Sequence, residues 1–419
     1  MAGPRTGPAE YRLSALELAS GWVLGLEDEL PGFSAAPADE TPLGALERAV
    51  LPSLRRPPCL VSFSGGRDSS AVLAVAVRAA RREGLPPPVP ATHRFPHASG
   101  TEEGEWQERV VRELGLDDWL RLEWDDELDI IGPIAARMLR RHGVLWPFNI
   151  HFLIPLLEAA SGGSLLTGVG GDDLFIPSRL APADAVLTGQ RRPTRRDLLK
   201  VAYAVSPGIV RRAAMRRRDP DPTPSRWLRD GARRAFKDTQ IALFATEPVR
   251  FNARLGWWLQ RRHFQMFFAH TRVLAAEVDV DISHPLLDPI FLAALGQSAR
   301  QLRVADRDYA MRLLFGSVLS EAICARPTKA TFVQPFWNRH SRAFVARWSG
   351  EGIDRELVDL EALRAEWATE APNARTFLLL QAAWLLEQEN GSTRDELEQA
   401  GSRLGDRAPA ARPAKLPAG

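Results

Sequence analysis

The chain has 419 residues, of which 45% are hydrophobic, and its formal net charge is +2. These values predict a globular protein with enough material for two or three domains. No run approaches the roughly 20 apolar residues needed to span a bilayer, and the first residues lack the charged and then apolar order of a signal peptide. We therefore expect a cytoplasmic protein that does not enter a membrane.

The cysteine pattern excludes two kinds of site. Cys59 and Cys324 are the only cysteines and form no C-x-x-C pair, so neither a disulfide framework nor a zinc knuckle is supported. We expect both to be ordinary buried residues. Most cations are arginines, which we attribute to a composition bias, and individual lysines therefore carry more information. The lysines are Lys200, Lys237, Lys329 and Lys415.

Residues 1–55 are predicted to form a helical lead-in, with an amphipathic helix over residues 11–30 and a Pro-rich loop after it. The sequence then alternates between strand and helix patterns. Strands are expected near residues 59–63, 89–95, 119–124 and 164–168, with helices near 69–82, from about 102, 126–142 and 150–160. This βαβα alternation predicts a parallel sheet with helices on both faces, in an α/β domain over residues 56–180.

After Pro182 the sequence shows no further strand pattern. We predict an all-helical second domain over residues 181–400, with tryptophan and phenylalanine on its apolar faces. Residues 401–419 are too poor in large apolar groups to order themselves, and a disordered tail is expected there.

The segment Ser64-Gly65-Gly66-Arg67-Asp68-Ser69 lies between a predicted strand and a predicted helix. Two glycines allow the backbone to approach a ligand closely, and free amides at a helix N-terminus favour an anion. The Walker spacing and its lysine are absent. An aspartate beside phosphates needs a cation between them, so Asp68 implies Mg²⁺. The alternative is a simple Gly-Gly turn in which Asp68 and Ser69 cap the helix.

A second glycine segment, TGVGGDDLF over Thr167–Phe175, follows another apolar strand. Loops at the carboxyl edge of an open α/β sheet are where ligands bind. Two such loops, about 100 residues apart in the sequence, predict a two-sided nucleotide site.

Five segments together resemble the asparagine synthetase superfamily. SFSGGRDSS is similar to its S-G-G-x-D-S pyrophosphatase loop, and TGVGGDDLF to its G-x-G-x-D-E-L-F signature, with Asp173 for the usual glutamate. WPFNIHFLIP resembles P-F-x-x-P-S-x-x-P, HPLLD resembles P-F-L-D, and RPTKATFVQP resembles R-x-K-x-G-F-x-x-P. The resemblance implies a PP-loop, or adenine-nucleotide α-hydrolase, sheet domain closed by a helical domain.

The resemblance also implies cofactors and site residues. ATP and Mg²⁺ are the expected cofactors, with Asp68 and Asp172 as the metal ligands. His93 is an expected nucleotide contact, although a lone histidine on a strand is more often structural. The phosphates would be held by Ser64, Gly65, Gly66 and Ser69, and the adenosine lined by Phe63, His93 and Gly168.

Lys329 stands where the family has a catalytic lysine. In that chemistry a carboxylate attacks the α-phosphorus, pyrophosphate leaves, and an amine attacks the acyl-adenylate. A compact cation held over both steps would lower both barriers. The alternative is a solvated surface lysine. Arg326 is the second expected catalytic residue, and two roles for it stay open: binding phosphate or covering the loop.

Three departures from the family motifs restrict which substrates and reactions we expect. Position 2 is Ala2 and only some 55 residues precede the sheet, so glutamine hydrolysis by the family's catalytic cysteine is not expected. Val169, where relatives have glutamate or tyrosine, has no proton to exchange, which disfavours free aspartate and ammonia as substrates. Asp308 replaces a lysine, for which Arg307 is a candidate substitute. Lasso-peptide cyclases share the T-K-A-x-F type of lysine segment but usually keep a glutaminase-like part.

An arginine-rich stretch runs from Gln190 to Lys237. It is interpreted either as a solvated helix face or as a field that attracts an acidic peptide or a carrier-bound substrate. No aromatic interleaving or known module supports nucleic-acid binding. The Trp257-Trp258 pair and the cluster at residues 264–268 are expected to be core.

The sequence therefore predicts a carbon–nitrogen ligase that forms AMP and pyrophosphate, acting in cyclisation or amidation in specialised peptide metabolism. An ammonia-dependent asparagine synthetase is the first alternative, and an inactive nucleotide-binding scaffold the second. A tRNA sulfur-transfer enzyme shares the first loop but has a C-x-x-C pair that is missing here. The expected partners are a small-molecule or peptide carboxylate and an amine, with a protease or carrier protein as a further candidate.

Overall fold

A five-stranded parallel sheet forms the centre of the protein, in a computed structural model that describes residues 11–27, 37, 39–98, 103–175, 178–217, 225–299, 307–326 and 333–390. Its spatial order is β3-β2-β1-β4-β5, so the chain adds strands to one side of β1 and later to the other. Ligands of open parallel sheets bind at the carboxyl ends of strands at such a switch point. The strands are β1 (Cys59–Ser62), β2 (Val89–Arg94), β3 (Leu120–Glu123), β4 (Ser164–Thr167) and β5 (Asp281–Ser283).

Both faces of the sheet are covered by helices, as the βα alternation predicts. Successive residues of a strand point to opposite faces. Leu60 and Leu165 accordingly enter one hydrophobic core, while Val61 and Leu166 enter the other. The mixed α/β class with a parallel sheet is confirmed.

One helical layer packs against the face that bears Val61. It contains α2 (Pro42–Leu54), α3 (Arg67–Glu83), α4 (Gly104–Glu113), α14 (Pro289–Gln297), α16 (Arg307–Phe315) and α17 (Glu321–Cys324). The layer on the opposite face contains α1 (Ala15–Ser20), α5 (Pro133–His142), η1 (Ile150–Phe152), α6 (Leu153–Ala159), α13 (Arg262–Ala276), α18 (Val333–Phe336), α19 (Arg339–Arg347), α20 (Leu360–Trp367), η3 (Ala374–Thr376) and a last helix over 377–390.

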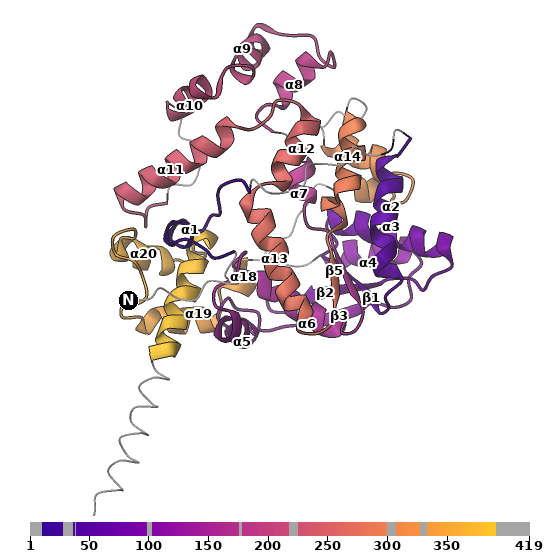
Figure 1. The fold of residues 1–419 in the computed structure, drawn as a ribbon. Helices are drawn as coiled ribbons and strands as arrows, with labels where there is room; N and C mark the ends of the chain where they lie inside the picture. Colours follow the sequence, from indigo (N-terminus) through magenta and orange to yellow (C-terminus); the bar gives the residue numbers. More distant parts are fainter. Residues whose placement is uncertain are drawn as a thin grey trace, which may run out of the picture.

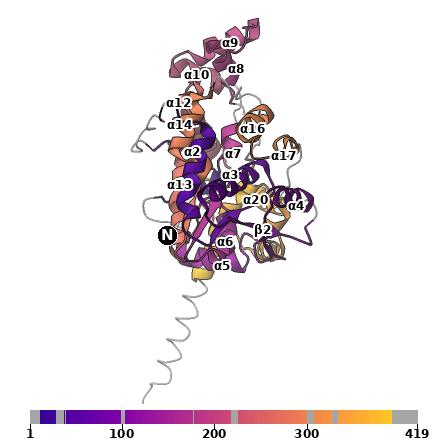
Figure 2. The same cartoon turned by 90° about the vertical axis from the view of Figure 1, so that its right-hand side faces the viewer.

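The remaining helices join or extend beyond these layers. In Figures 1 and 2 helices α8, α9 and α10 stand at the top of the molecule, away from the sheet, and α11 and α12 lead back toward it. None of the described helices is long and apolar enough to cross a membrane. These elements are α7 (Gly171–Phe175), α8 (Ala181–Leu187), α9 (Arg195–Ala204), α10 (Gly208–Arg216), α11 (Asp230–Ala245), α12 (Phe251–Leu259) and η2 (Pro285–Leu287).

The expectation that no strand follows Pro182 is wrong. β5 pairs in parallel with β4, with Ser164 opposite Asp281 and Leu166 opposite Ser283. Its three residues contain a single apolar side chain, Ile282, which is too short a pattern to be recognised before pairing is known. The fifth strand completes the sheet beside the second glycine loop.

Three helix predictions also need correction. The helix expected over residues 11–30 is limited to α1, and the described residues 21–27 are not helical. Residues 42–54, predicted to be loop, form α2, because Thr41 accepts a hydrogen bond from Gly44 N at 3.1 Å and Pro42 suits the first helical turn. Residues 126–132, predicted to be helical, form turns, and α5 begins only at Pro133. The expected disordered tail lies outside the described residues.

Asp129 joins these turns to the C-terminal helices. Its side chain is fully buried and accepts hydrogen bonds from Ile131 N at 3.0 Å, Asn338 N at 2.9 Å and Ser341 N at 3.0 Å. The Ser341 hydroxyl donates a further bond at 2.5 Å. This carboxylate therefore fixes the start of α19 against the sheet domain, shortly after the segment that contains Lys329.

Replacing Asp129 with alanine would leave three backbone amides without their acceptor, two of them buried. We expect the Asp129→Ala variant to lose about 3 kcal/mol of unfolding free energy, since buried unsatisfied donors are costly. Urea denaturation measures the loss. Asp125→Ala, at an exposed position in the same turn, is the matched control and should change stability by less than about 0.5 kcal/mol. Equal stability of both variants would contradict the anchoring role.

Candidate active site

The first glycine loop connects β1 to α3 and is held by its own hydroxyl groups. Ser64 Oγ lies 3.1 Å from Ser69 Oγ and accepts a hydrogen bond from Gly66 N at 3.2 Å. Ser69 Oγ donates to Gly66 O at 3.1 Å. Gly65 has a φ of +82°, and a Cβ there would lie 2.7 Å from Gln107 Cγ. The loop is thus preformed at a helix N-terminus, where backbone amides favour an anion.

The second glycine loop lies directly on the first. A Cβ on Gly168 would be 2.8 Å from Ser69 N, and one on Gly171 would be 2.2 Å from Asp68 Cγ. Only glycine lets the two backbones approach so closely. The sequence prediction of a two-sided site is supported by this contact, because segments distant in the sequence meet at the carboxyl ends of the adjacent strands β1 and β4.

Asp68 and Asp172 converge on one cation, the guanidinium of Arg307. Arg307 Nη2 donates to Asp68 Oδ1 at 3.0 Å and Oδ2 at 2.9 Å, and Nη1 donates to Asp172 Oδ1 at 2.9 Å. Burial opposes the charge of Arg307, but the two carboxylates outweigh it and raise the pKa of the guanidinium. The sequence identified Arg307 only as a substitute for a missing lysine. In the structure it bridges the two predicted metal ligands.

The residues present fit a divalent cation. Two carboxylates from different loops converge at the site, and both accept hydrogen bonds from the guanidinium of Arg307. Carboxylate oxygens are the ligands that Mg²⁺ prefers, usually one or two of them together with substrate phosphates and water. Asp68 and Asp172 would hold the ion. Neighbouring Asp173 lies beside them, and burial raises the pKa of its carboxyl group.

Arg326 is a buried residue that contacts the backbone of the first loop. Its Nη1 donates to Gly65 O at 2.7 Å and its Nη2 to Glu103 Oε1 at 2.7 Å, and the side chain is only 3% exposed. The guanidinium also lies 5.1 Å from the centre of the Trp106 ring. Of the two roles left open by the sequence, these contacts favour covering the loop. The sequence did not single out Glu103, whose position at the start of α4 is not distinctive.

Two predicted adenosine contacts already use their polar groups within the protein. Phe63 is 1% exposed, with its ring in the core, and its carbonyl accepts a hydrogen bond from Thr92 Oγ1 at 2.7 Å. His93 Nδ1 accepts from Trp124 Nε1 at 2.8 Å, so its Nε2 donates to Phe152 O at 2.9 Å. Burial lowers the pKa of His93 to about 4. His93 is therefore neutral, and its part in nucleotide binding stays a prediction.

The remaining predictions concern Lys329, Asp308 and the two cysteines. Lys329 lies outside the described residues, although Arg326, three positions before it, is fixed on the first loop. Asp308 forms an ion pair with Arg67, so it fastens α16 to the start of α3. Cys59 and Cys324 are buried and unpaired, as expected.

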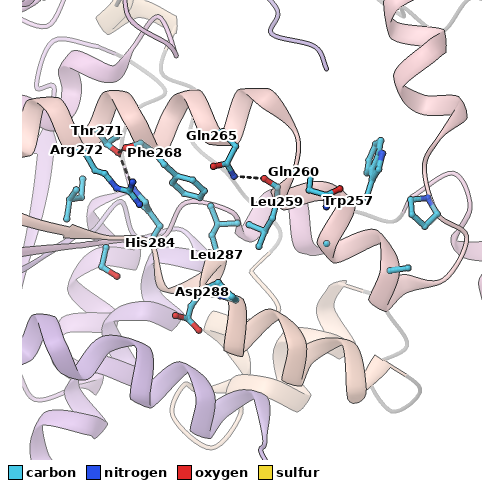
Figure 3. A pocket seen from close by; sticks show the side chains of 16 residues that line it. Trp257, Leu259, Gln260, Gln265, Phe268, Thr271, Arg272, His284, Leu287 and Asp288 are labelled. Carbon is cyan, nitrogen blue, oxygen red and sulfur yellow. Dashed lines mark hydrogen bonds between the residues drawn. The ribbon is translucent and has the colours of Figure 1, made fainter. Parts of the chain in front are cut away.

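A cavity of about 660 Å³ adjoins the second glycine loop (Figure 3). His284 forms its wall and joins it to β4, because His284 Nδ1 lies 2.7 Å from Thr167 Oγ1. Burial lowers the pKa of His284 to about 3. Figure 3 shows Phe268 projecting from α13 toward Leu287, the residue that a Cβ on Gly170 would strike at 2.5 Å. The sequence expected the aromatic cluster of α13 to be core, whereas Phe268 also lines this cavity.

The fold and this site define a nucleotide-binding α/β enzyme with two glycine loops at a switch point. The sequence model of the asparagine synthase family matches residues 43–388, and the chain belongs to that family. It is therefore a carbon–nitrogen ligase that uses ATP, and its sheet domain has the PP-loop type of fold. None of the curated proteins compared with the chain matches it significantly.

Gly171 offers a direct test of the contact between the loops. In Gly171→Ala the new methyl group must displace Asp68, and we expect Mg²⁺-ATP affinity to fall at least about tenfold, because a lost contact to a charged group costs about 1.5 to 3 kcal/mol. Titration calorimetry measures the affinity. The control is Gly208→Ala, where a Cβ meets no atom within 4 Å. Unchanged ATP binding by Gly171→Ala would contradict the two-sided site.

Arg307 should compete with divalent cations for Asp68 and Asp172. We expect Arg307→Met to bind Mn²⁺ at least about tenfold more tightly without nucleotide, because a unit charge at roughly 4 Å is worth about 1 to 4 kcal/mol. Electron paramagnetic resonance of free Mn²⁺ measures this affinity. Arg312→Met, on the same helix, should behave as the unmodified protein. Weaker Mn²⁺ binding by Arg307→Met would show that the guanidinium does not occupy the metal position.

Proposed function

We propose that the protein activates a carboxylate as an acyl-adenylate and transfers the acyl group to an amine. In the first step a carboxylate oxygen attacks the α-phosphorus of ATP, a new P–O bond forms, and the bond to the β-phosphate oxygen breaks to release pyrophosphate. In the second step the amine nitrogen attacks the acyl carbon. The C–N bond forms, AMP leaves with the C–O electron pair, and the amine loses a proton.

The observation that carries this proposal is the convergence of Asp68 and Asp172 beside the preformed Ser64–Ser69 loop. A loop that only bound phosphate would need amides and cations. Two carboxylates from two loops are useful only if a metal ion lies between them and the phosphates. When bound, Mg²⁺ would neutralise charge on the phosphate oxygens.

The chain's own residues bind and orient the nucleotide around this position. Ser64, Gly65, Gly66 and Ser69 present amides and hydroxyls to phosphate oxygens, and Gly168 lets the second loop close the site. Asp68 and Asp172 would hold the metal ion, and Arg307, which bonds both acids, adds positive charge beside them. Such a preorganised group of donors lowers the barrier where negative charge develops.

Lys329 is proposed as the cation that acts in both steps. Its place in the segment that resembles the family's R-x-K-x-G-F-x-x-P motif supports this role, as does the attachment of Arg326, three positions earlier, to the first loop. A lysine ammonium is a compact charge, which suits an oxyanion that forms only in the transition state.

The proposed substrates are a peptide or small-molecule carboxylate and an amine. The amine is either part of the same substrate, which gives cyclisation, or a separate molecule, which gives amidation. Val169 supports this choice, since it provides no group that could bind or deprotonate free ammonia. A carrier protein or protease would supply the carboxylate substrate. Ammonia-dependent asparagine synthesis is the second candidate, and family membership supports it.

The test is release of AMP and pyrophosphate from Mg²⁺-ATP over a panel of aspartate, amino-acid analogues and candidate acidic peptides. We expect at least one carboxylate to give both products in equal amounts. Lys329→Ala should lower the rate of this reaction about 1,000-fold, as loss of an electrostatic catalyst does, while ATP binding changes little. Lys237→Ala on α11 is the matched control and should keep full activity.

Two results would overturn or redirect the proposal. Release of ADP and phosphate, or equal activity of the Lys329→Ala and Lys237→Ala variants, contradicts acyl-adenylate chemistry with Lys329 as the catalyst. Asparagine formed from aspartate and ammonium at a rate above that of every peptide substrate favours the second candidate instead.

A further inference from the structure

A second cavity, of about 930 Å³, begins at Asp173 and extends away from the glycine loops beneath α9 and α10. This volume is within the usual range of ligand pockets, roughly 300 to 1,000 Å³. Asp173 directly follows Asp172, so the cavity opens beside the predicted metal position. The helices that cover it, α8, α9 and α10, stand away from the sheet in Figures 1 and 2.

The walls of this cavity combine aromatic rings with buried arginines. Arg211 and Arg261 line it and are each only 7% exposed. The Arg261 guanidinium lies 5.5 Å from the centre of the Trp257 ring, and that of Arg211 lies 5.7 Å from the centre of the Tyr203 ring. The rings can contact a flat apolar group while the guanidinium groups meet a charge.

Both arginines retain unused hydrogen-bonding capacity. Among the described residues, Nε of Arg211 and Nε of Arg261 have no hydrogen-bond acceptor. Burial lowers the pKa of Arg261, and the charges of Asp173 and Glu247 only partly offset it. Buried polar groups are normally paired, so a ligand that accepts hydrogen bonds from these two groups would satisfy them.

The acidic groups of the cavity are outnumbered by its cations, so the cavity carries a net positive charge. Glu247 already accepts a hydrogen bond from Ser178 Oγ at 2.5 Å and lies 3.9 Å from Arg254 Nε. Asp173 is therefore the main counter-charge of Arg261. Exposed cations add to the excess along the wall: Arg179, Lys200 and Arg217.

We infer that this cavity binds the body of the ligase's substrate, and that it selects an aromatic or large apolar group bearing a negative charge, which Arg211 and Arg261 hold. The identification of the ligand as the ligase's substrate rests on the proposed function. The preference of the pocket for an apolar anion does not depend on that function. It also gives the arginine-rich stretch of the sequence a function: part of that stretch lines a pocket for an acidic ligand.

The experiment compares two probes of nearly equal shape, 2-naphthylacetate and 2-naphthylacetamide, by titration calorimetry on the full chain. We expect the acid to bind about tenfold more tightly than the amide, because hydrogen bonds to charged partners are worth more than neutral ones. The Arg211→Met/Arg261→Met double variant should lose this preference and still bind the amide. Retained amide binding reports that the cavity is intact, and Arg261→Lys should keep part of the preference.

Two control variants locate the binding. Arg212→Met, an exposed neighbour on α10, should leave the preference unchanged. Ile209→Ser removes an apolar side chain that is 81% exposed on α10 and should also have no effect. An acid preference that survives the double variant, or binding of both probes that Ile209→Ser abolishes, contradicts the assignment.

A third comparison distinguishes a peptide ligand from a small acid. It also distinguishes failure of the pocket assignment from failure of the proposed function. N-acetyl-Phe-Glu-Phe-amide and its glutamine analogue test whether a peptide binds with the same charge preference. Preference for the acidic peptide identifies a peptide ligand, and preference only for naphthylacetate identifies a small acid. Charge-selective binding without any ATP cleavage would contradict the ligase proposal alone, whereas equal binding of every acid and its amide would contradict the pocket alone.

Discussion

The contact between the two glycine loops is the constraint on which the site depends. Gly168 lies against Ser69 and Gly171 against Asp68, at distances that admit no side chain. This contact is made where β1 and β4 run side by side and the strand order of the sheet reverses. Asp68 and Asp172 are consequently carried to one point by two rigid elements, and neither carboxylate has to be positioned by a flexible side chain alone.

Bringing two carboxylates together costs free energy unless a cation lies between them. Arg307 supplies such a cation, and the ion pair of Asp308 with Arg67 fastens the same helix, α16, to the first loop. A metal ion held by both acids would compete with the guanidinium of Arg307, and its binding would then be coupled to the position of α16.

Features encoded by short sequence patterns could be predicted, whereas features that depend on contacts between distant segments could not. Both glycine loops, the strands that precede them and the acid pair follow from short segments whose residue types have a direct physical meaning. Arg307 could be recognised only as an arginine beside Asp308, because its role depends on acids more than 130 residues away in the chain. β5 and the burial of Arg211 and Arg261 are likewise products of packing. A three-residue strand and a cationic helix face have no distinctive pattern until their neighbours are known.

The central claim is that a carboxylate attacks the α-phosphorus of ATP at the Asp68 and Asp172 position. The most direct measurement uses an accepted substrate labelled with ¹⁸O in both carboxylate oxygens and analyses the AMP by mass spectrometry. Acyl-adenylate formation followed by amide formation transfers one labelled oxygen to AMP at each turnover. AMP without label, or label recovered in phosphate, would show that activation takes another route and would contradict the mechanism.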